Sequence, residues 1–232
     1  MIGAGTNYVV ATVKSWNVAA YRQRRLSLPG SWTLISRPED LSVENLKALA
    51  PRYVFFPHWS WRVPMEIVDG FDCVCFHMTD VPYGRGGSPL QNLILRGHRN
   101  TVLSALRMVR ELDAGPVYMK RPLDLAGTAQ EIYQRATGIV FDMIEEITRT
   151  EPAPQPQQGT PVVFERRTPE QSELPHAGTP EQICDFIRML DADTYPPAYL
   201  HWGKFRLEFD RAKQDGEYVI ARVRIAQRGS DP

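Results

Sequence analysis

Residues 72–79 read DCVCFHMT, a largely apolar run that ends just before a proline and a glycine-rich stretch. A run of this length that is bounded by turn residues predicts a buried strand. Similar runs lie upstream at residues 8–13 (YVVATV), 32–36 (WTLIS) and 53–56 (YVFF), with helical spacing between them. Strands that alternate with helices predict βαβ units, so we expect an α/β fold with a mostly parallel sheet and helices on both faces.

The downstream sequence extends this Rossmann-like pattern. A glycine-rich turn at residues 83–87 leads into Ser88-Pro89-Leu90-Gln91, where Ser88 is expected to cap a helix. Residues 101–110 and 116–122 predict two further strands. The capping box Thr128-x-x-Glu131 then predicts a long helix, along which apolar residues recur at helical spacing to residue 147.

Composition divides the chain into three parts. Residues 1–150 are expected to form the main domain, and residues 151–175 begin with EPAPQPQQG, which is typical of an extended linker. Residues 176–232 predict a small subdomain: a helix capped by Thr179 and Gln182, then a β-hairpin around Asp215-Gly216. Because the hairpin alternates polar and apolar residues, it is also a candidate edge for a homodimer.

Charge and cysteine content limit the expected partners and compartment. Lys and Arg total 27, as do Asp and Glu, so the chain lacks the basic excess that DNA or tRNA binding favours. Three cysteines are too few for a disulfide scaffold and indicate a reducing compartment. The N-terminus has no secretory pattern and no apolar run approaches membrane-spanning length, so we expect a cytoplasmic protein without a membrane partner.

His77 and Asp113 are the first candidates for chemistry. His77 lies near the carboxyl end of its predicted strand, where ligands bind in open α/β sheets, although a core histidine bonded to backbone also fits this position. Asp113 lies in the turn LDAGP, where an aspartate often caps its own backbone. Together they predict a general base, His77, and a carboxylate that orients it.

Other patterns have simpler explanations. Cys73, Cys75 and His77 share one strand face and, with Cys184 or His58, could bind zinc, but period-2 ligands on a parallel strand are an unusual chelate, so we expect no metal. The glycines before Ser88 lack the spacing and lysine of a P-loop and fit a turn. The arginines near residues 22–25 fit a solvated helix end better than a phosphate site.

Several motifs resemble one enzyme family. Residues 76–89 (FHMTDVPYGRGGSP) resemble the N-x-H-P-S-x-L-P-x-x-R-G signature of formyltransferases that use N10-formyltetrahydrofolate, and residues 112–116 (LDAGP) resemble their L-D-T-G-P/D motif. Near the end of the chain, residues 166–172 (RRTPEQS), 187–191 (IRMLD) and 195–199 (YPPAY) are similar to the tail of sugar N-formyltransferases. The resemblance covers most of the chain after about residue 53.

The resemblance implies a catalytic triad of Asn, His and Asp. It maps the histidine onto His77 and the aspartate onto Asp113, whereas Cys75 stands at the asparagine position. A thiol is a weaker donor to an oxyanion than an amide, so Asn92 is a candidate replacement donor, with Gln91 and Thr79 as others. The expected reaction is direct transfer, in which neutral His77 removes a proton from the attacking amine.

The resemblance also implies the substrates. The donor is N10-formyltetrahydrofolate, bound without a metal beside the loop at residues 57–64; its candidate contacts are Trp59, Ser60, Trp61, Arg85 and Gly86. The expected acceptor is the amine of a nucleotide-activated amino sugar in glycan biosynthesis, since the post-linker segment is short and the chain has no basic excess. Alternatives are a methionyl-tRNA or glycinamide-ribonucleotide formyltransferase, or a catalytically impaired folate- or nucleotide-sugar-binding protein.

Overall fold

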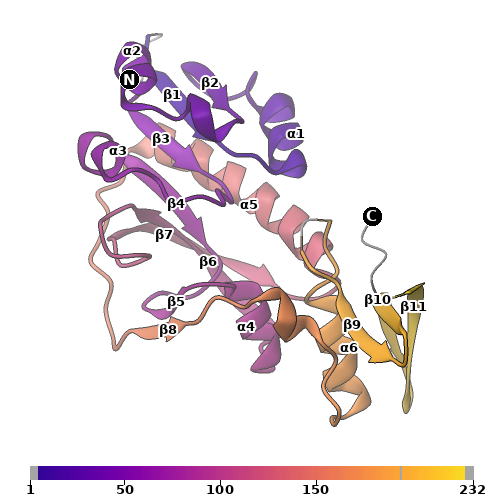
Figure 1. The fold of residues 1–232 in the computed structure, drawn as a ribbon. Coiled ribbons are helices and arrows are strands. Elements are labelled where there is room, and N and C mark those ends of the chain that lie inside the picture. The colour runs from indigo at the N-terminus through magenta and orange to yellow at the C-terminus, as the bar shows by residue number, and fades with distance from the viewer. Residues whose placement is uncertain (1–4, 194, 228–232) are drawn as a thin grey trace. The chain divides into compact units, whose positions relative to one another are not determined.

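The computed structural model describes residues 5–193 and 195–227, which form three sheets and six α-helices (Figure 1). The main sheet has six strands in the order β2-β1-β3-β4-β6-β7. These strands are β1 (Asn7–Ala11), β2 (Ser31–Ile35), β3 (Tyr53–Phe56), β4 (Cys73–His77), β6 (Asn100–Arg107) and β7 (Val117–Asp124). Four strands, β1 to β4, are mutually parallel, and β6 joins β4 antiparallel. The prediction of a mostly parallel sheet is therefore confirmed.

Helices pack on both faces of this sheet. The described chain has α1 (Ser15–Arg24), α2 (Val43–Leu49), α3 (Met65–Gly70), α4 (Pro89–Leu95), α5 (Ala129–Thr150) and α6 (Pro180–Arg188), of which α1, α2, α3 and most of α5 belong to the same unit as most of the sheet. Alternate strand residues point to one face, where Val54 and Cys73 belong to a buried cluster with Leu46 of α2 and Ile67 of α3. On the other face α1 lies beside α5, since Thr137 Oγ1 donates to Asn17 Oδ1 over 2.5 Å (Figure 1).

The chain divides into two compact units that cut across the expected boundaries. The first contains the chain up to Gly86, residues 102–123 and residues 134–163. The second contains residues 87–101, residues 124–133 and the chain from Phe164 onward. Residues 151–163, expected to belong to a linker, thus pack with the first unit. No helix of the described residues is long and apolar enough to cross a bilayer.

A three-stranded antiparallel sheet follows α6 in the second unit. Its order is β11-β10-β9, with β9 (Ala198–Trp202), β10 (Phe205–Asp215) and β11 (Tyr218–Gln227), and a bulge interrupts β10 between Asp210 and Lys213. The predicted hairpin is therefore present, and β9 is an additional strand. Two short 3₁₀ helices, Pro38–Asp40 and Pro169–Ser172, complete the helical elements.

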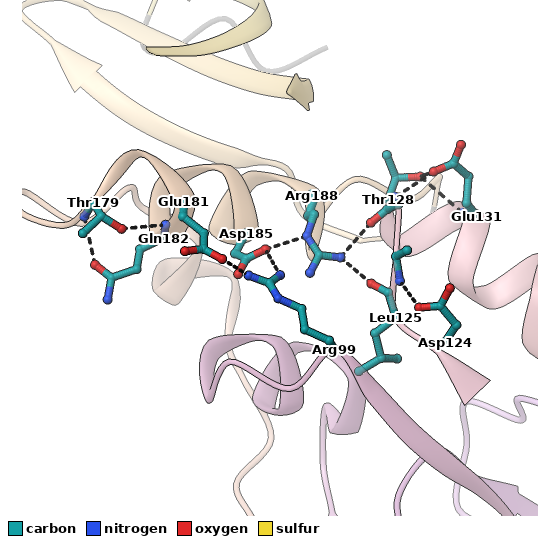
Figure 2. Close-up of polar contacts among 12 residues, drawn as sticks. Arg99, Asp124, Leu125, Thr128, Glu131, Thr179, Glu181, Gln182, Asp185 and Arg188 are labelled. Atoms are coloured by element: carbon teal, nitrogen blue, oxygen red, sulfur yellow. Dashed lines mark hydrogen bonds and ion pairs between the residues drawn. The ribbon is translucent and has the colours of Figure 1, made fainter. Parts of the chain in front are cut away.

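A buried ion pair attaches α6 to the rest of the second unit (Figure 2). Arg188 Nε donates to Asp185 Oδ1 over 2.7 Å, and its Nη1 donates to the carbonyls of Leu125 and Gly127. The same oxygen of Asp185 accepts from Arg99 at 3.0 Å. Three of the five N–H groups of the buried guanidinium therefore have acceptors, one of them a carboxylate, which offsets the cost of burying its charge.

Two of the three predicted caps are confirmed. Thr179 and Gln182 form a reciprocal capping box, and Thr128 and Glu131 exchange the same bonds, as Figure 2 shows. Ser88 does not cap α4: its backbone is left-handed at φ 47°, and its side chain makes no cap bond. Instead Ser88 Oγ accepts from Arg167 N at 3.0 Å and lies 3.1 Å from Tyr195 Oη.

The glycine-rich stretch also differs from its prediction. Residues expected to form only a turn contain β5 (Tyr83–Gly86), which pairs with β8 (Val162–Phe164) in a two-stranded sheet. Gly84 and Gly86 have φ values of 76° and 100°, a region that only glycine enters at low cost. The glycines thus shape an irregular strand that passes beside the end of β4.

Candidate active site

His77 is the last residue of β4 and points its imidazole toward the loop that follows. The ring is buried, with 8% of the side chain exposed. Its Nε2 lies 2.7 Å from the carbonyl oxygen of Gly84, which also accepts from Thr79 Oγ1 at 3.2 Å. The carboxyl end of the strand therefore presents a histidine held on one side by backbone.

Asp113 lies on the other side of the ring. Its Oδ2 is 3.5 Å from His77 Nδ1 and accepts a hydrogen bond from the backbone N–H of Gly86 at 3.0 Å. The backbone of Asp113 is left-handed, with φ 54°, and 11% of its side chain is exposed. The fold thus brings together the two residues that the sequence selected as base and orienting carboxylate.

Hydrogen-bond chemistry constrains the ring in this arrangement. The Gly84 carbonyl can only accept, so Nε2 must carry a hydrogen, and Nδ1 faces a carboxylate that is also an acceptor. A ring with hydrogens on both nitrogens satisfies both partners. With both N–H groups bonded in this way, the ring can transfer a proton to or from a substrate, as an acid or as a base, only after one nitrogen leaves its acceptor.

Cys75 lies two residues before His77 on the same strand face and is half-buried. Burial, together with the nearby carboxylate of Asp113, raises the pKa of the Cys75 thiol well above its usual value. The thiol therefore stays protonated at neutral pH, which makes it a poor nucleophile and a weak hydrogen-bond donor.

The candidate replacement donors are engaged in other bonds. Asn92, on α4, donates from Nδ2 to the carbonyls of Gly87, Ser88 and Glu165 over 3.0 to 3.1 Å. Gln91 donates to Tyr133 Oη and to the carbonyl of Met189. An oxyanion role for Asn92 would require these bonds to break, so that role stays a prediction.

The loop at residues 57–64 combines a half-buried indole, Trp59, with an exposed one, Trp61. Trp59 packs against Phe56 with 6.0 Å between ring centroids, and its indole N–H is buried without a hydrogen-bond partner among the described residues. Trp61 is 50% exposed and contacts Trp59 edge-on at 5.4 Å, while Ser60 is exposed. The two indoles touch each other here, so a flat heterocycle would stack on Trp61 alone or separate the pair.

Arg85 and Gly86 are neighbours on β5 near Asp113, but they bond to different partners through different atoms. Gly86 contributes its backbone N–H, as described above, whereas the Arg85 guanidinium donates to Gln157 Oε1 from Nε at 3.0 Å and from Nη2 at 2.8 Å. Gln157 was not among the predicted site residues. Its Pro- and Gln-rich surroundings carry no periodic signal, so only the folded chain reveals this contact.

The described residues contain no ligand set for the zinc site considered as an alternative. Among residues 5–193 and 195–227, no three His, Cys, Asp or Glu side chains come together as metal ligands. Burial lowers the pKa of His58 to about 4, with a contribution from the charge of Lys14. Cys73 is buried, and the pKa of its thiol is raised to about 12.

Comparisons with known proteins agree with the motifs. Residues 169–226 match the family model described as the C-terminal domain of methionyl-tRNA formyltransferase. A solved structure titled methionyl-tRNA formyltransferase from Clostridium thermocellum is 47% identical, covers 96% of this chain and 99% of its own, and superimposes with a TM-score of 0.93.

More distant relatives share part of the sequence or the fold. The methionyl-tRNA formyltransferase of Sinorhizobium medicae is 30% identical over 55% of this chain and 44% of its own length. This chain spans about half the length of the curated relatives that it matches. A likely sugar N-formyltransferase from Mycobacterium tuberculosis has a TM-score of 0.68 at 16% identity, covering 98% of this chain and 100% of its own, which shows a shared fold.

Proposed function

Because the chain belongs to the formyltransferase family, we propose that it transfers a formyl group from N10-formyltetrahydrofolate to a primary amine. The observation that carries the proposal is the His77–Asp113 pair at the carboxyl end of β4, with Nδ1 and Oδ2 3.5 Å apart. The orphan indole N–H of Trp59 offers a donor to a folate heterocycle, and the exposed ring of Trp61 offers a stacking surface. We propose no metal.

The proposed mechanism is direct transfer. The amine nitrogen forms a bond to the formyl carbon, the bond from that carbon to N10 of the donor breaks, and the amine proton is transferred to N10. His77 relays that proton: one ring nitrogen turns from its acceptor, Gly84 or Asp113, to the reacting atoms, donates a proton to N10 and recovers one from the amine. While it is charged, the ring also stabilises the developing oxyanion. Asp113 keeps the ring oriented, while Cys75, as a protonated thiol, contributes a weak bond to the oxyanion.

The acceptor that we propose first is methionyl-tRNA. The solved structure that is 47% identical to this chain and the curated relatives at 30% and 26% identity carry the name methionyl-tRNA formyltransferase, which favours this alternative over the amino sugar expected from the sequence. A nucleotide-linked amino sugar is the second candidate. One observation favours it: the equal numbers of acidic and basic residues give the chain no general attraction to a polyanion.

The test is an acceptor comparison with one enzyme preparation. Purified protein and N10-formyltetrahydrofolate are incubated with methionyl-tRNA or with a panel of nucleotide-linked amino sugars, and the formylated product is quantified by mass spectrometry. His77→Ala should reduce the rate by about 10² to 10⁴-fold, as expected for loss of a general acid or base. Asp69→Asn, which removes a surface carboxylate paired with Arg110, should leave the rate unchanged.

The outcomes separate the alternatives. Formylation of only one acceptor class identifies the substrate. Binding of 5-formyltetrahydrofolate by calorimetry without transfer to any amine would instead support a catalytically impaired binding protein. Neither binding nor transfer by a folded sample would reject the proposed function.

A further inference from the structure

The first part of the segment that was expected to be an extended linker is bound to the first unit. Gln155 and Val117 form an antiparallel bridge, in which Val117 N donates to Gln155 O at 2.7 Å and Gln155 N donates to Val117 O at 2.8 Å. This bridge places the next residues of the segment beside the turn that carries Asp113. Those residues therefore have a defined position next to the candidate active site.

Gln157 uses its whole side-chain amide in this position. Its Nε2 donates to the carbonyl oxygens of Asp113 at 2.7 Å and Gly115 at 2.8 Å. Its Oε1 accepts the two hydrogen bonds from Arg85 at 3.0 and 2.8 Å. Two donors and two acceptor sites are all that a glutamine amide offers, so every one is satisfied.

The turn that these bonds hold is strained. Asp113 is a non-glycine residue in the left-handed region, which is sparsely populated and persists only when the surroundings enforce it. Gly115 passes so close to β6 that a Cβ on it would lie 1.7 Å from the carbonyl oxygen of Arg107. Without bonds to Gln157, this turn would lose two of the contacts that select its conformation.

The Gln157 amide is also linked, through Arg85, to β5, the strand that binds the Asp113 carboxylate. Arg85 is adjacent to Gly86, whose N–H donates to Asp113 Oδ2. Gln157 thus joins the backbone that carries Asp113 to the strand that binds its side chain. Gln157 therefore contacts both the turn that carries Asp113 and the strand whose backbone N–H binds the Asp113 carboxylate.

We propose that Gln157 is a positioning residue, which holds Asp113 in the geometry needed to orient His77. The inference rests on the proposed function, because it assigns Gln157 a role in formyl transfer. It adds part of the segment after α5 to the active site, where the sequence alone had indicated a linker.

The test compares three variants by steady-state kinetics with the acceptor identified above. Gln157→Ala removes the bridge, and Gln157→Glu keeps its shape and its acceptors for Arg85 but places a carboxylate against two carbonyls. Both should lower kcat about 10- to 100-fold, the range seen when supporting hydrogen bonds of an active site are removed, with KM values unchanged. Gln155→Ala is the matched control, since among the described residues its exposed side chain bonds to the carbonyl of Ala153 alone, and its backbone bridge to Val117 remains.

A wild-type kcat in a folded Gln157→Ala or Gln157→Glu variant would overturn the proposal, as would a loss equal to that of Gln155→Ala or confined to KM. If Gln157→Ala does not fold, the kcat of Gln157→Glu tests the proposal in its place. Amide hydrogen exchange of residues 111–117 provides a readout that does not require activity, and it should be faster in the Gln157 variants. If wild-type protein transfers no formyl group, the proposed function fails; unchanged exchange in the Gln157 variants would then reject the positioning role separately.

Discussion

Arg188 and Asp185 form an ion pair within α6 in which only 10% and 13% of the side chains are exposed, with 2.7 Å between Nε and Oδ1 (Figure 2). Arg188→Met should destabilise the protein by about 3–5 kcal/mol, because the carbonyls of Leu125 and Gly127 lose a donor and the buried carboxylate of Asp185 keeps only Arg99. Urea unfolding measures this loss. Arg149→Ala, which breaks a more exposed pair with Glu145 on α5, should cost less than about 1 kcal/mol, and equal losses would contradict the argument.

The Gly115 turn makes a second prediction. An alanine Cβ would overlap the carbonyl of Arg107, which belongs to backbone and cannot rotate away, so Gly115→Ala should cost about 1–3 kcal/mol or more of unfolding free energy. Gly138→Ala in α5 is the matched control. Its Cβ meets nothing within 4 Å, so it should stabilise the helix by about 0.5–1 kcal/mol. A neutral Gly115→Ala would show that β6 and the turn separate easily.

The free energy of unfolding should fall at alkaline pH because of the buried thiol of Cys73. Burial raises the pKa of Cys73 in the folded protein to about 12, from an ordinary value of 9.0, so the folded state binds this proton more tightly than the unfolded state. The resulting stabilisation is complete below about pH 9 and is lost as the pH rises toward 12, by about 1.4 kcal/mol per pH unit. Urea unfolding from pH 8 to 11 should therefore show a steeper decline for wild type than for Cys73→Ala. Parallel curves would contradict the prediction.

Substitution of Cys75 tests whether a stronger hydrogen-bond donor at this position speeds formyl transfer. A protonated thiol donates weakly, whereas an asparagine amide at this position would donate strongly, so Cys75→Asn should raise kcat for formyl transfer. Loss of one good oxyanion donor costs about 10² to 10³ in kcat elsewhere, which sets the upper limit of the gain. Cys75→Ala serves as the control for removing the thiol alone. An unchanged or lower kcat in Cys75→Asn would show that Cys75 belongs to a working variant of the site.

Local patterns in the sequence determined most of the secondary structure. Period-2 and period-3.6 apolar spacing depends on which side of a single element faces the core, so it located β1 to β4 and α5 within a few residues. The capping boxes at Thr128 and Thr179 formed as predicted, because their partners lie only three residues away. The conjunction of His77 and Asp113 was also accessible, since each ends or follows a recognisable strand.

Tertiary structure decided the contacts between distant segments. Ser88 lies in a sequence typical of a helix cap, yet its hydroxyl bonds to Arg167 N and Tyr195 Oη instead. Gln157 reaches a turn 44 residues earlier in the chain, from a stretch whose composition indicates only an extended linker. A polar side chain bonds to whichever group the fold brings near, and neither periodicity nor composition encodes that choice. For this reason the sequence identified His77 and Asp113 as a candidate pair, whereas the contact of Gln157 with the Asp113 turn became visible only in the folded chain.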